Sequence, residues 1–199
     1  MILPNVDPSA DATPDTLPDL LGPDLKVVFV GINPSSYSAA RGHYFARPQS
    51  RFWPAFSRSR LSAPIRRALG RDQLGPEDDR ALPGFGFGFT DVVKRPSSNA
   101  AALRPADFAR WAPDLPRRLA GSSPSVLCFH GTMAFRPFRR WALAPGRPER
   151  PVALGAQPET LDGARIFVVP NPSPANAHVS PSDQVGWYDR LADFVEQIG

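Results

Sequence analysis

The sequence predicts an α/β protein, a three-layer α/β/α sandwich around a short central and mainly parallel β-sheet. Short runs of Val, Ile, Leu and Phe recur along the chain, as in parallel strands that are buried on both faces. They alternate with segments of helical apolar spacing, an order typical of strands joined by crossover helices. With 199 residues, 42% of them hydrophobic, the chain is long enough for one domain with its own core.

Four segments have strand patterns. Residues 25–30, 125–129 and 166–169 are apolar runs and are predicted to be the buried strands. Residues 84–89 alternate Gly with Phe, a looser strand pattern whose rings are predicted to lie in the core. The region 144–160 is predicted to be a loop with an edge strand.

Helical segments lie between the predicted strands and after the last of them. Pro54 and Pro64 divide the first segment into pieces, because proline interrupts a helix interior. The predicted helices cover residues 52–69, 105–119, 133–141 and 183–198. Residues 35–50 are predicted to form a long functional loop.

The first 24 residues differ in composition from the rest of the chain. They contain five prolines and five aspartates but no basic residue. Such a segment is expected to be largely disordered or loosely laid on the surface. We therefore predict an acidic, proline-rich tail over residues 1–24 and a single domain over residues 25–199.

The remaining residues carry 23 basic and 14 acidic side chains, and nearly all the basic ones are arginine. Arginine suits bidentate contacts with phosphate, so a nucleic-acid partner is one explanation. The alternative is that abundant arginine and proline reflect a base bias of the genome. Charge alone does not choose between the two.

Composition also argues against several classes of protein. No apolar run reaches the roughly 18 residues of a membrane span, and the N-terminus lacks a secretion signal pattern, so a cytoplasmic protein is expected. The single cysteine, Cys128, lies in an apolar run, which favours a core position over a nucleophile. Three scattered histidines and one cysteine argue against a zinc or iron–sulfur site.

Two predicted strand ends share one design. The first strand leads into Gly-Ile-Asn-Pro-Ser at residues 31–35, and the last strand leads into Pro-Asn-Pro-Ser at residues 170–173. In open α/β sheets, ligands bind beyond the carboxyl ends of the strands. The two turns therefore predict one site that is lined from two sides.

Three blocks occur in order along the chain. They are Gly-Ile-Asn-Pro at residues 31–34, with Gly-His-Tyr-Phe-Ala-Arg-Pro at 42–48 and Arg-Phe-Trp at 51–53; Gly-Phe-Thr-Asp-Val-Val-Lys-Arg-Pro at 88–96; and Val-Val-Pro-Asn-Pro-Ser at 168–173. Together they resemble the motifs of the mismatch-specific uracil/thymine DNA glycosylases, a family of the uracil-DNA glycosylase superfamily.

The resemblance implies a DNA repair enzyme that flips uracil out of DNA, notably from U·G mismatches, and hydrolyses its N-glycosidic bond to leave an abasic site. It implies double-stranded DNA as the partner, with single-stranded DNA as a further option. A monomer associated with the nucleoid is expected, with no metal and no cofactor. Because Lys26 and Lys94 are the only lysines, a Schiff-base lyase reaction is not expected.

The resemblance also assigns roles to residues of the first block. In the family, the position of Asn33 holds the attacking water, and that of Phe45 stacks on the flipped base. An amide does not take up a proton at neutral pH, so Asn33 would position water without acting as a strong base. The other interpretation of Asn33 is a cap that bonds the nearby backbone. The groups expected to bind the base edge are Gly31, Ile32, Ser38 and Asn171.

The segment after the last strand corresponds to the family's wedge, which enters the base stack where the flipped base was. It contains no large apolar side chain. We therefore expect removal of uracil from a broader range of contexts, without strict dependence on a mismatched guanine. His178 is either a phosphate or base contact or a solvated loop residue. The predicted wedge residues are Ser173, Pro174, Ala175, Asn176 and His178.

Asp91 departs from the family, which commonly has a basic residue at this place. A carboxylate at a strand end beside the cleft could activate water, which Asn33 cannot do. The alternatives are a helix N-cap or an ion pair with Lys94 or Arg95. We favour a site in which Asn33 and Asp91 share the catalytic work.

Two other functions stay open. A related glycosylase could act mainly on another damaged pyrimidine, such as ethenocytosine, because a stacking pocket accepts different bases. A homologue without catalysis would bind DNA with steep salt dependence but give no turnover. A nucleotide hydrolase is disfavoured, since the chain has no P-loop or Gly-x-Gly-x-x-Gly motif.

Overall fold

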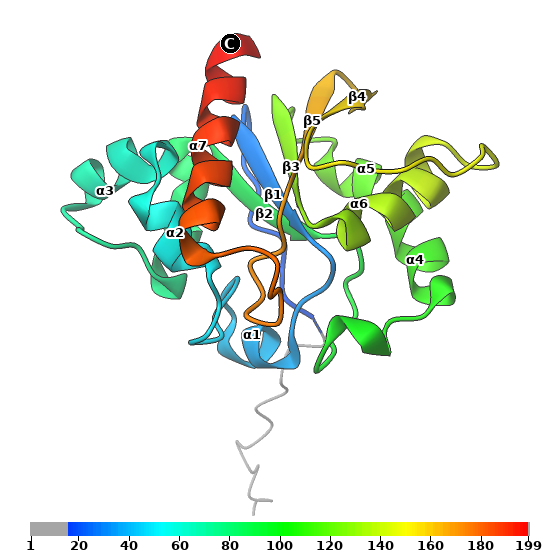
Figure 1. Ribbon diagram of the computed structural model, residues 1–199, viewed down its shortest axis with the longest axis horizontal. Coiled ribbons are helices and arrows are strands. Elements are labelled where there is room, and N and C mark those ends of the chain that lie inside the picture. The colour runs from blue at the N-terminus through cyan, green and yellow to red at the C-terminus, as the bar shows by residue number, and fades with distance from the viewer. Residues whose placement is uncertain (1–15, 199) are drawn as a thin grey trace, which may run out of the picture.

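The computed structural model describes residues 16–198, which form a five-stranded sheet with helices on both faces (Figure 1). The strand order is β2-β1-β3-β5-β4. Four strands are parallel, and β4 runs antiparallel to β5 at one edge. The strands are β1 (Val27–Gly31), β2 (Phe87–Asp91), β3 (Val126–His130), β4 (Gly155–Leu161) and β5 (Ala164–Val169). The predicted α/β/α class is confirmed.

Two helical layers cover the sheet. Helices α2, α3 and α7 lie on one side of it, and α4, α5 and α6 lie on the other (Figure 1). The helices are α1 (Ser36–Arg41), α2 (Phe52–Arg58), α3 (Ala63–Leu69), α4 (Pro105–Trp111), α5 (Leu115–Leu119), α6 (Thr132–Phe138) and α7 (Pro181–Ile198). Shorter 3₁₀ turns span Arg60–Ser62, Pro76–Phe85, Ala100–Ala102 and Ala112–Asp114, and a π turn spans Arg139–Leu143.

Alternate residues of each central strand enter opposite cores. Val27 and Phe29 of β1 pack with α2 and α7, whereas Val28 and Val30 pack on the other face with α5 and α6. This explains why the strands appear in the sequence as unbroken apolar runs. Cys128 of β3 is fully buried, and burial raises the pKa of its thiol well above the usual range. Its predicted core position is confirmed.

One predicted loop contains a helix. Within residues 35–50, Ser35 caps the six-residue helix α1 by accepting a hydrogen bond from Ser38 N, and Gly42 ends it in a left-handed conformation with φ of 70°. A helix this short has too few residues to show apolar periodicity. Among the described residues, no helix is long and apolar enough to cross a membrane.

The domain begins earlier than residue 25. Residues 16–24, here called the N-terminal strap, pack against β2: Leu17 is buried, and Leu20 exchanges two backbone hydrogen bonds with Phe89. The strap therefore belongs to the packed domain and not to a surface tail. Its three leucines supply the apolar contacts that the acidic composition obscured. The disorder expected for residues 1–15 lies outside the described residues.

Candidate active site

A cleft of about 600 Å³ opens at the carboxyl ends of β1, β2, β3 and β5. The chain runs from β1 outward to β2 and returns to β3 on the other side of β1, so the cleft lies at a topological switch point. Its size suits a ligand as large as a nucleotide. Ten of the predicted site residues line it: Gly31, Ile32, Asn33, Ser38, Phe45, Asp91, Asn171, Ser173, Pro174 and Ala175.

Asn33 is held by its amide nitrogen. Nδ2 donates to the carbonyl oxygens of Pro34 (3.1 Å) and Arg95 (3.0 Å) and to Ser97 Oγ (2.8 Å). These acceptors fix the orientation of the amide, and no described residue donates a hydrogen bond to Oδ1. Asn33 thus bonds the nearby backbone, as the capping interpretation expects, and still presents a carbonyl oxygen that can hold water.

Phe45 presents a ring in the cleft from a strained position. Its φ is 53°, in the left-handed region that bulky residues rarely adopt. The ring stacks on Phe52 with centroids 4.2 Å apart and planes 13° apart. Neighbouring bonds hold this loop: Trp53 Nε1 donates to Tyr44 O, and Tyr44 N donates to Asp79 Oδ2. The ring is therefore supported from behind, as a stacking platform requires.

Asp91 ends β2 directly beside Gly31, its register partner on β1. The carboxyl group fits there because residue 31 has no side chain: a Cβ on Gly31 would lie 2.3 Å from Asp91 Oδ1. Asp91 is 4% exposed, and no described residue donates to its Oδ2. Burial raises the pKa of Asp91 to about 7, partly offset by Lys94.

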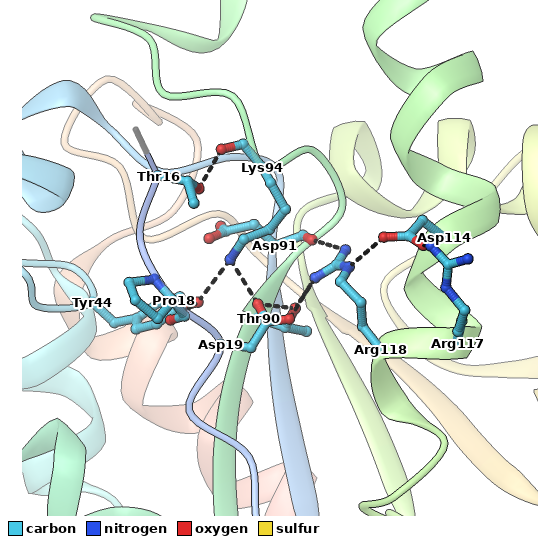
Figure 2. Close-up of polar contacts among 10 residues, drawn as sticks. All are labelled: Thr16, Pro18, Asp19, Tyr44, Thr90, Asp91, Lys94, Asp114, Arg117 and Arg118. Atoms are coloured by element: carbon cyan, nitrogen blue, oxygen red, sulfur yellow. Dashed lines mark hydrogen bonds and ion pairs between the residues drawn. The ribbon is translucent and has the colours of Figure 1, made fainter. Parts of the chain in front are cut away.

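Neither structural alternative for Asp91 is what the structure shows. Asp91 caps no helix, because a bend and an irregular segment follow β2 and the next helical turn begins only at Ala100. Lys94 pairs with Asp19 at 2.6 Å, and Arg95 pairs with Asp107 at 2.7 Å. The Asp91 carboxyl group is left without an ion-pair partner among the described residues (Figure 2).

The predicted base-edge groups differ in how free they are. Ser38 Oγ accepts a hydrogen bond from Ala46 N, which ties α1 to the Phe45 loop. Asn171 Oδ1 accepts from Ser173 N within its own turn, which leaves its amide nitrogen as the donor available to the cleft. Asn171 and Asn33 enter the cleft from opposite sides of β3, which confirms that the two Asn-Pro-Ser turns line one cavity.

The predicted wedge is a braced loop. Arg51, whose role was not predicted, donates through Nη1 to the carbonyl oxygens of Asn176 (3.0 Å) and Val179 (2.7 Å), and through Nη2 to that of Pro174 (3.3 Å). Asn176 does not line the cleft; its Nδ2 donates to Asn171 O. His178 is exposed and also lies outside the cleft lining. DNA contacts by these two residues stay predictions.

His130 is a further cleft residue that was not predicted. It ends β3, is 2% exposed, and lies with its ring 5.0 Å from that of Phe45. Its Nε2 lies 3.0 Å from Tyr188 Oη, and burial lowers the pKa of His130 to about 3, so the ring is neutral. The signal available in the sequence was its position at a third strand end.

No group of three or more His, Cys, Asp or Glu side chains that could hold a metal ion occurs within residues 16–198. The chemistry available in the described cleft is that of an amide oxygen, a carboxyl group of raised pKa, a neutral imidazole and an aromatic face.

Comparison with known proteins identifies the class. Residues 18–192 match the family model of the Uracil DNA glycosylase superfamily, and the chain belongs to this superfamily. A solution NMR structure of a protein from Methanosarcina acetivorans, provisionally assigned as a uracil DNA glycosylase, is similar with a TM-score of 0.55. The two chains are 18% identical over 91% of this chain and 97% of the other, a likeness that supports the fold.

Proposed function

We propose that the protein removes uracil from DNA by hydrolysing the N-glycosidic bond, and that Asn33 and Asp91 share the work. The observation that carries the proposal is their juxtaposition. A fixed amide with a free carbonyl oxygen and an unpaired carboxyl group line one cleft beside a supported aromatic ring. Membership in the superfamily supports the same reaction.

The proposed reaction divides into binding and hydrolysis. A flipped uracil stacks on Phe45, a contact worth about 1–3 kcal/mol, and Asn33 Oδ1 accepts a hydrogen bond from the attacking water. The water oxygen bonds to C1′ as the bond from C1′ to N1 breaks, and the electron pair leaves with the uracil anion. Asp91 takes the proton from water. The anion later gains a proton from solvent.

The composition of the wedge bears on how strictly the protein depends on a mismatch. The loop residues that line the cleft are Ser173, Pro174 and Ala175, which offer little apolar bulk to fill the space of a flipped base. We therefore expect uracil removal opposite either guanine or adenine, with the mismatch preferred because its base is easier to flip.

The test is strand cleavage after base removal. A duplex with one uracil is incubated with the protein and EDTA and then treated with alkali, which breaks the strand at an abasic site. Cleavage at the uracil position is expected. The panel includes U·G, U·A, single-stranded uracil, T·G and ethenocytosine. Binding of the duplex without cleavage would show a catalytically inactive homologue, and cleavage of ethenocytosine alone would show a different substrate.

The pH profile tests the role of Asp91. Because a general base must be ionised, the single-turnover rate is expected to rise with pH through about 7 and then level off. Asp91→Asn should lower the plateau about 10²–10⁴-fold and remove the acidic limb while DNA binding persists. Asn33→Ala should leave measurable excision. Equal rates for Asp91→Asn and wild type across pH 5–8 would make Asp91 structural.

A further inference from the structure

The N-terminal strap lies along β2 and reaches the cleft. Leu20 forms an antiparallel bridge with Phe89 at the open edge of the sheet, with hydrogen bonds of 2.9 and 2.8 Å. Tyr44 Oη donates to Pro18 O at 3.1 Å, and Leu17 lines the cleft itself. The strap thus holds Asp19, which lies between these anchors, beside the carboxyl end of β2.

Asp19 binds two cations at once (Figure 2). Its Oδ1 lies 2.6 Å from Lys94 Nζ, and its Oδ2 lies 2.8 Å from Arg118 Nη1. Thr90 Oγ1 also donates to Oδ1 at 2.8 Å. Both cations are largely buried, with 7% and 16% of their side chains exposed. Removing the Asp19 carboxylate would leave Lys94 without a carboxylate partner in a poorly hydrated site, whereas Arg118 would keep its second partner, Asp114, at 3.4 Å.

The same two cations are the ones whose charges lower the pKa of Asp91, yet neither bonds its carboxyl group. Arg118 Nη2 donates to the backbone oxygen of Asp91 at 2.7 Å, and Lys94 points to Asp19 (Figure 2). The pKa of Asp91 is raised chiefly by burial; Lys94 and Arg118 oppose this, and the negative charge of Asp19 supports it. Two further ionisable residues that line the cleft stay neutral: Tyr44, whose pKa is raised well above 10, and His130, whose pKa is about 3.

We propose that Asp19 is a positioning residue of this reaction: by binding Lys94 and Arg118, it keeps the Asp91 carboxyl group unpaired and able to accept a proton from water. This inference rests on the proposed role of Asp91 as the base. It also gives the acidic N-terminal segment a function, because its residue 19 completes the electrostatic surroundings of the site.

The physical consequence of losing Asp19 is a new ion pair. Lys94 has a flexible stem and, without its partner, would gain most by turning to the Asp91 carboxylate. A cation within about 4–6 Å stabilises the ionised carboxylate and lowers its pKa, so the paired group is a weaker base. The acidic limb of the pH profile would move to lower pH, and the plateau rate would fall.

The experiment compares single-turnover uracil excision between pH 5 and 9 in Asp19→Asn and in Glu159→Gln. The control is matched, because Glu159, like Asp19, pairs with two basic side chains, here Arg139 and Arg150, and is similarly buried. Glu159 lies on β4, outside the cleft lining. Asp19→Asn should shift the limb down by roughly one pH unit or more and lower the plateau about tenfold or more. Glu159→Gln should keep both.

Two further variants keep the inference testable if Asp19→Asn folds poorly. Asp19→Glu retains the carboxylate and should restore the wild-type limb. Asp19→Asn combined with Lys94→Met removes the freed ammonium and should move the limb back toward wild type. An unmoved limb in folded Asp19→Asn would overturn the inference and leave the proposed function intact. A wild-type profile without any limb assignable to Asp91 would overturn both the inference and the proposed role of Asp91 as the base, while uracil removal itself is tested by the strand-cleavage experiment.

Discussion

Gly31 shows what the absence of one side chain does at the site. The Asp91 carboxyl group occupies the space where a Cβ of residue 31 would lie. Gly31 is the last residue of β1, where it has ordinary strand backbone and pairs in parallel register with Asp91. Glycine is therefore needed here for space and not for conformation.

Gly31→Ala is expected to displace the Asp91 carboxyl group and to lower single-turnover excision about 10²-fold or more, because a contact of 2.3 Å cannot be tolerated. The control is Gly186→Ala in α7, where a Cβ meets nothing within 4 Å. It should keep full activity and gain about 0.5–1 kcal/mol of stability. A fully active Gly31→Ala would show that Asp91 need not occupy this position.

The buried Asp91 also makes stability depend on pH. Its pKa of about 7 in the folded protein exceeds the usual 3.8, so the folded state binds the proton more tightly than the unfolded state. The stabilising contribution is complete below about pH 4 and is lost as pH rises through 7, roughly 4 kcal/mol in all. The free energy of unfolding of the wild type, measured with urea, should thus fall relative to that of Asp91→Asn between pH 4 and 8. Parallel stability curves would contradict the burial of an unpaired carboxyl group.

Among single residues, the sequence identified those that belong to a motif or have an unusual chemistry for their position. Asn33 and Phe45 occupy motif positions, and Asp91 is a carboxylate where the family commonly has a basic residue. His130 and Arg51 were missed for different reasons. His130 required knowing that β3 ends at the same edge as β1, and Arg51 acts through the backbone carbonyls of a loop more than 120 residues away.

At the scale of elements, one arginine holds the conformation of the loop of residues 171–179. The guanidinium of Arg51 binds three of its carbonyl oxygens, and Arg51 N donates to Pro172 O. In Figure 1 this loop lies beside α1 at the end of the sheet where the cleft opens. In the proposed role as a DNA wedge, the loop would bind in a preset shape, which would reduce the conformational entropy lost on binding.

Arg51→Met is expected to loosen the loop and to lower excision from duplex uracil about tenfold or more, since each lost charged hydrogen bond is worth about 1.5–3 kcal/mol. Single-stranded uracil should be affected less, because no base stack has to be filled. Arg66→Met is the control: this guanidinium bonds the carbonyl oxygen of Asp72 beside α3. Equal losses on both substrates would argue against a role in the duplex.

Element prediction succeeded where length and burial were large. The central strands are fully buried, and α7 has 18 residues, so their patterns were readable. Helix α1 is set by a serine cap and a left-handed glycine over six residues. Strand β4 is half exposed and irregular in register, so its sequence lacks clear alternation.

For the whole molecule, the order of apolar runs was sufficient to predict the layers, but not the domain boundary. The strap contains Asp19 and Asp24 and two prolines, a composition shared with unfolded segments. Its fixed position depends on tertiary partners: the sheet edge at Phe89 and the close approach permitted by Gly88, where a Cβ would lie 2.9 Å from Leu20 O. Such long-range contacts are not visible in local sequence.

The burial of Cys128 has a practical consequence for all these variants. The chain's one thiol lies at the centre of β3, in the core that packs with α2 and α7, and its raised pKa suppresses the thiolate. A thiol reagent can modify it only when the sheet opens. The labelling rate in native buffer therefore reports the free energy of opening without denaturant and without any engineered label. Each substitution in the cleft can thus be assessed for its effect on folding through a side chain that does not line the cleft.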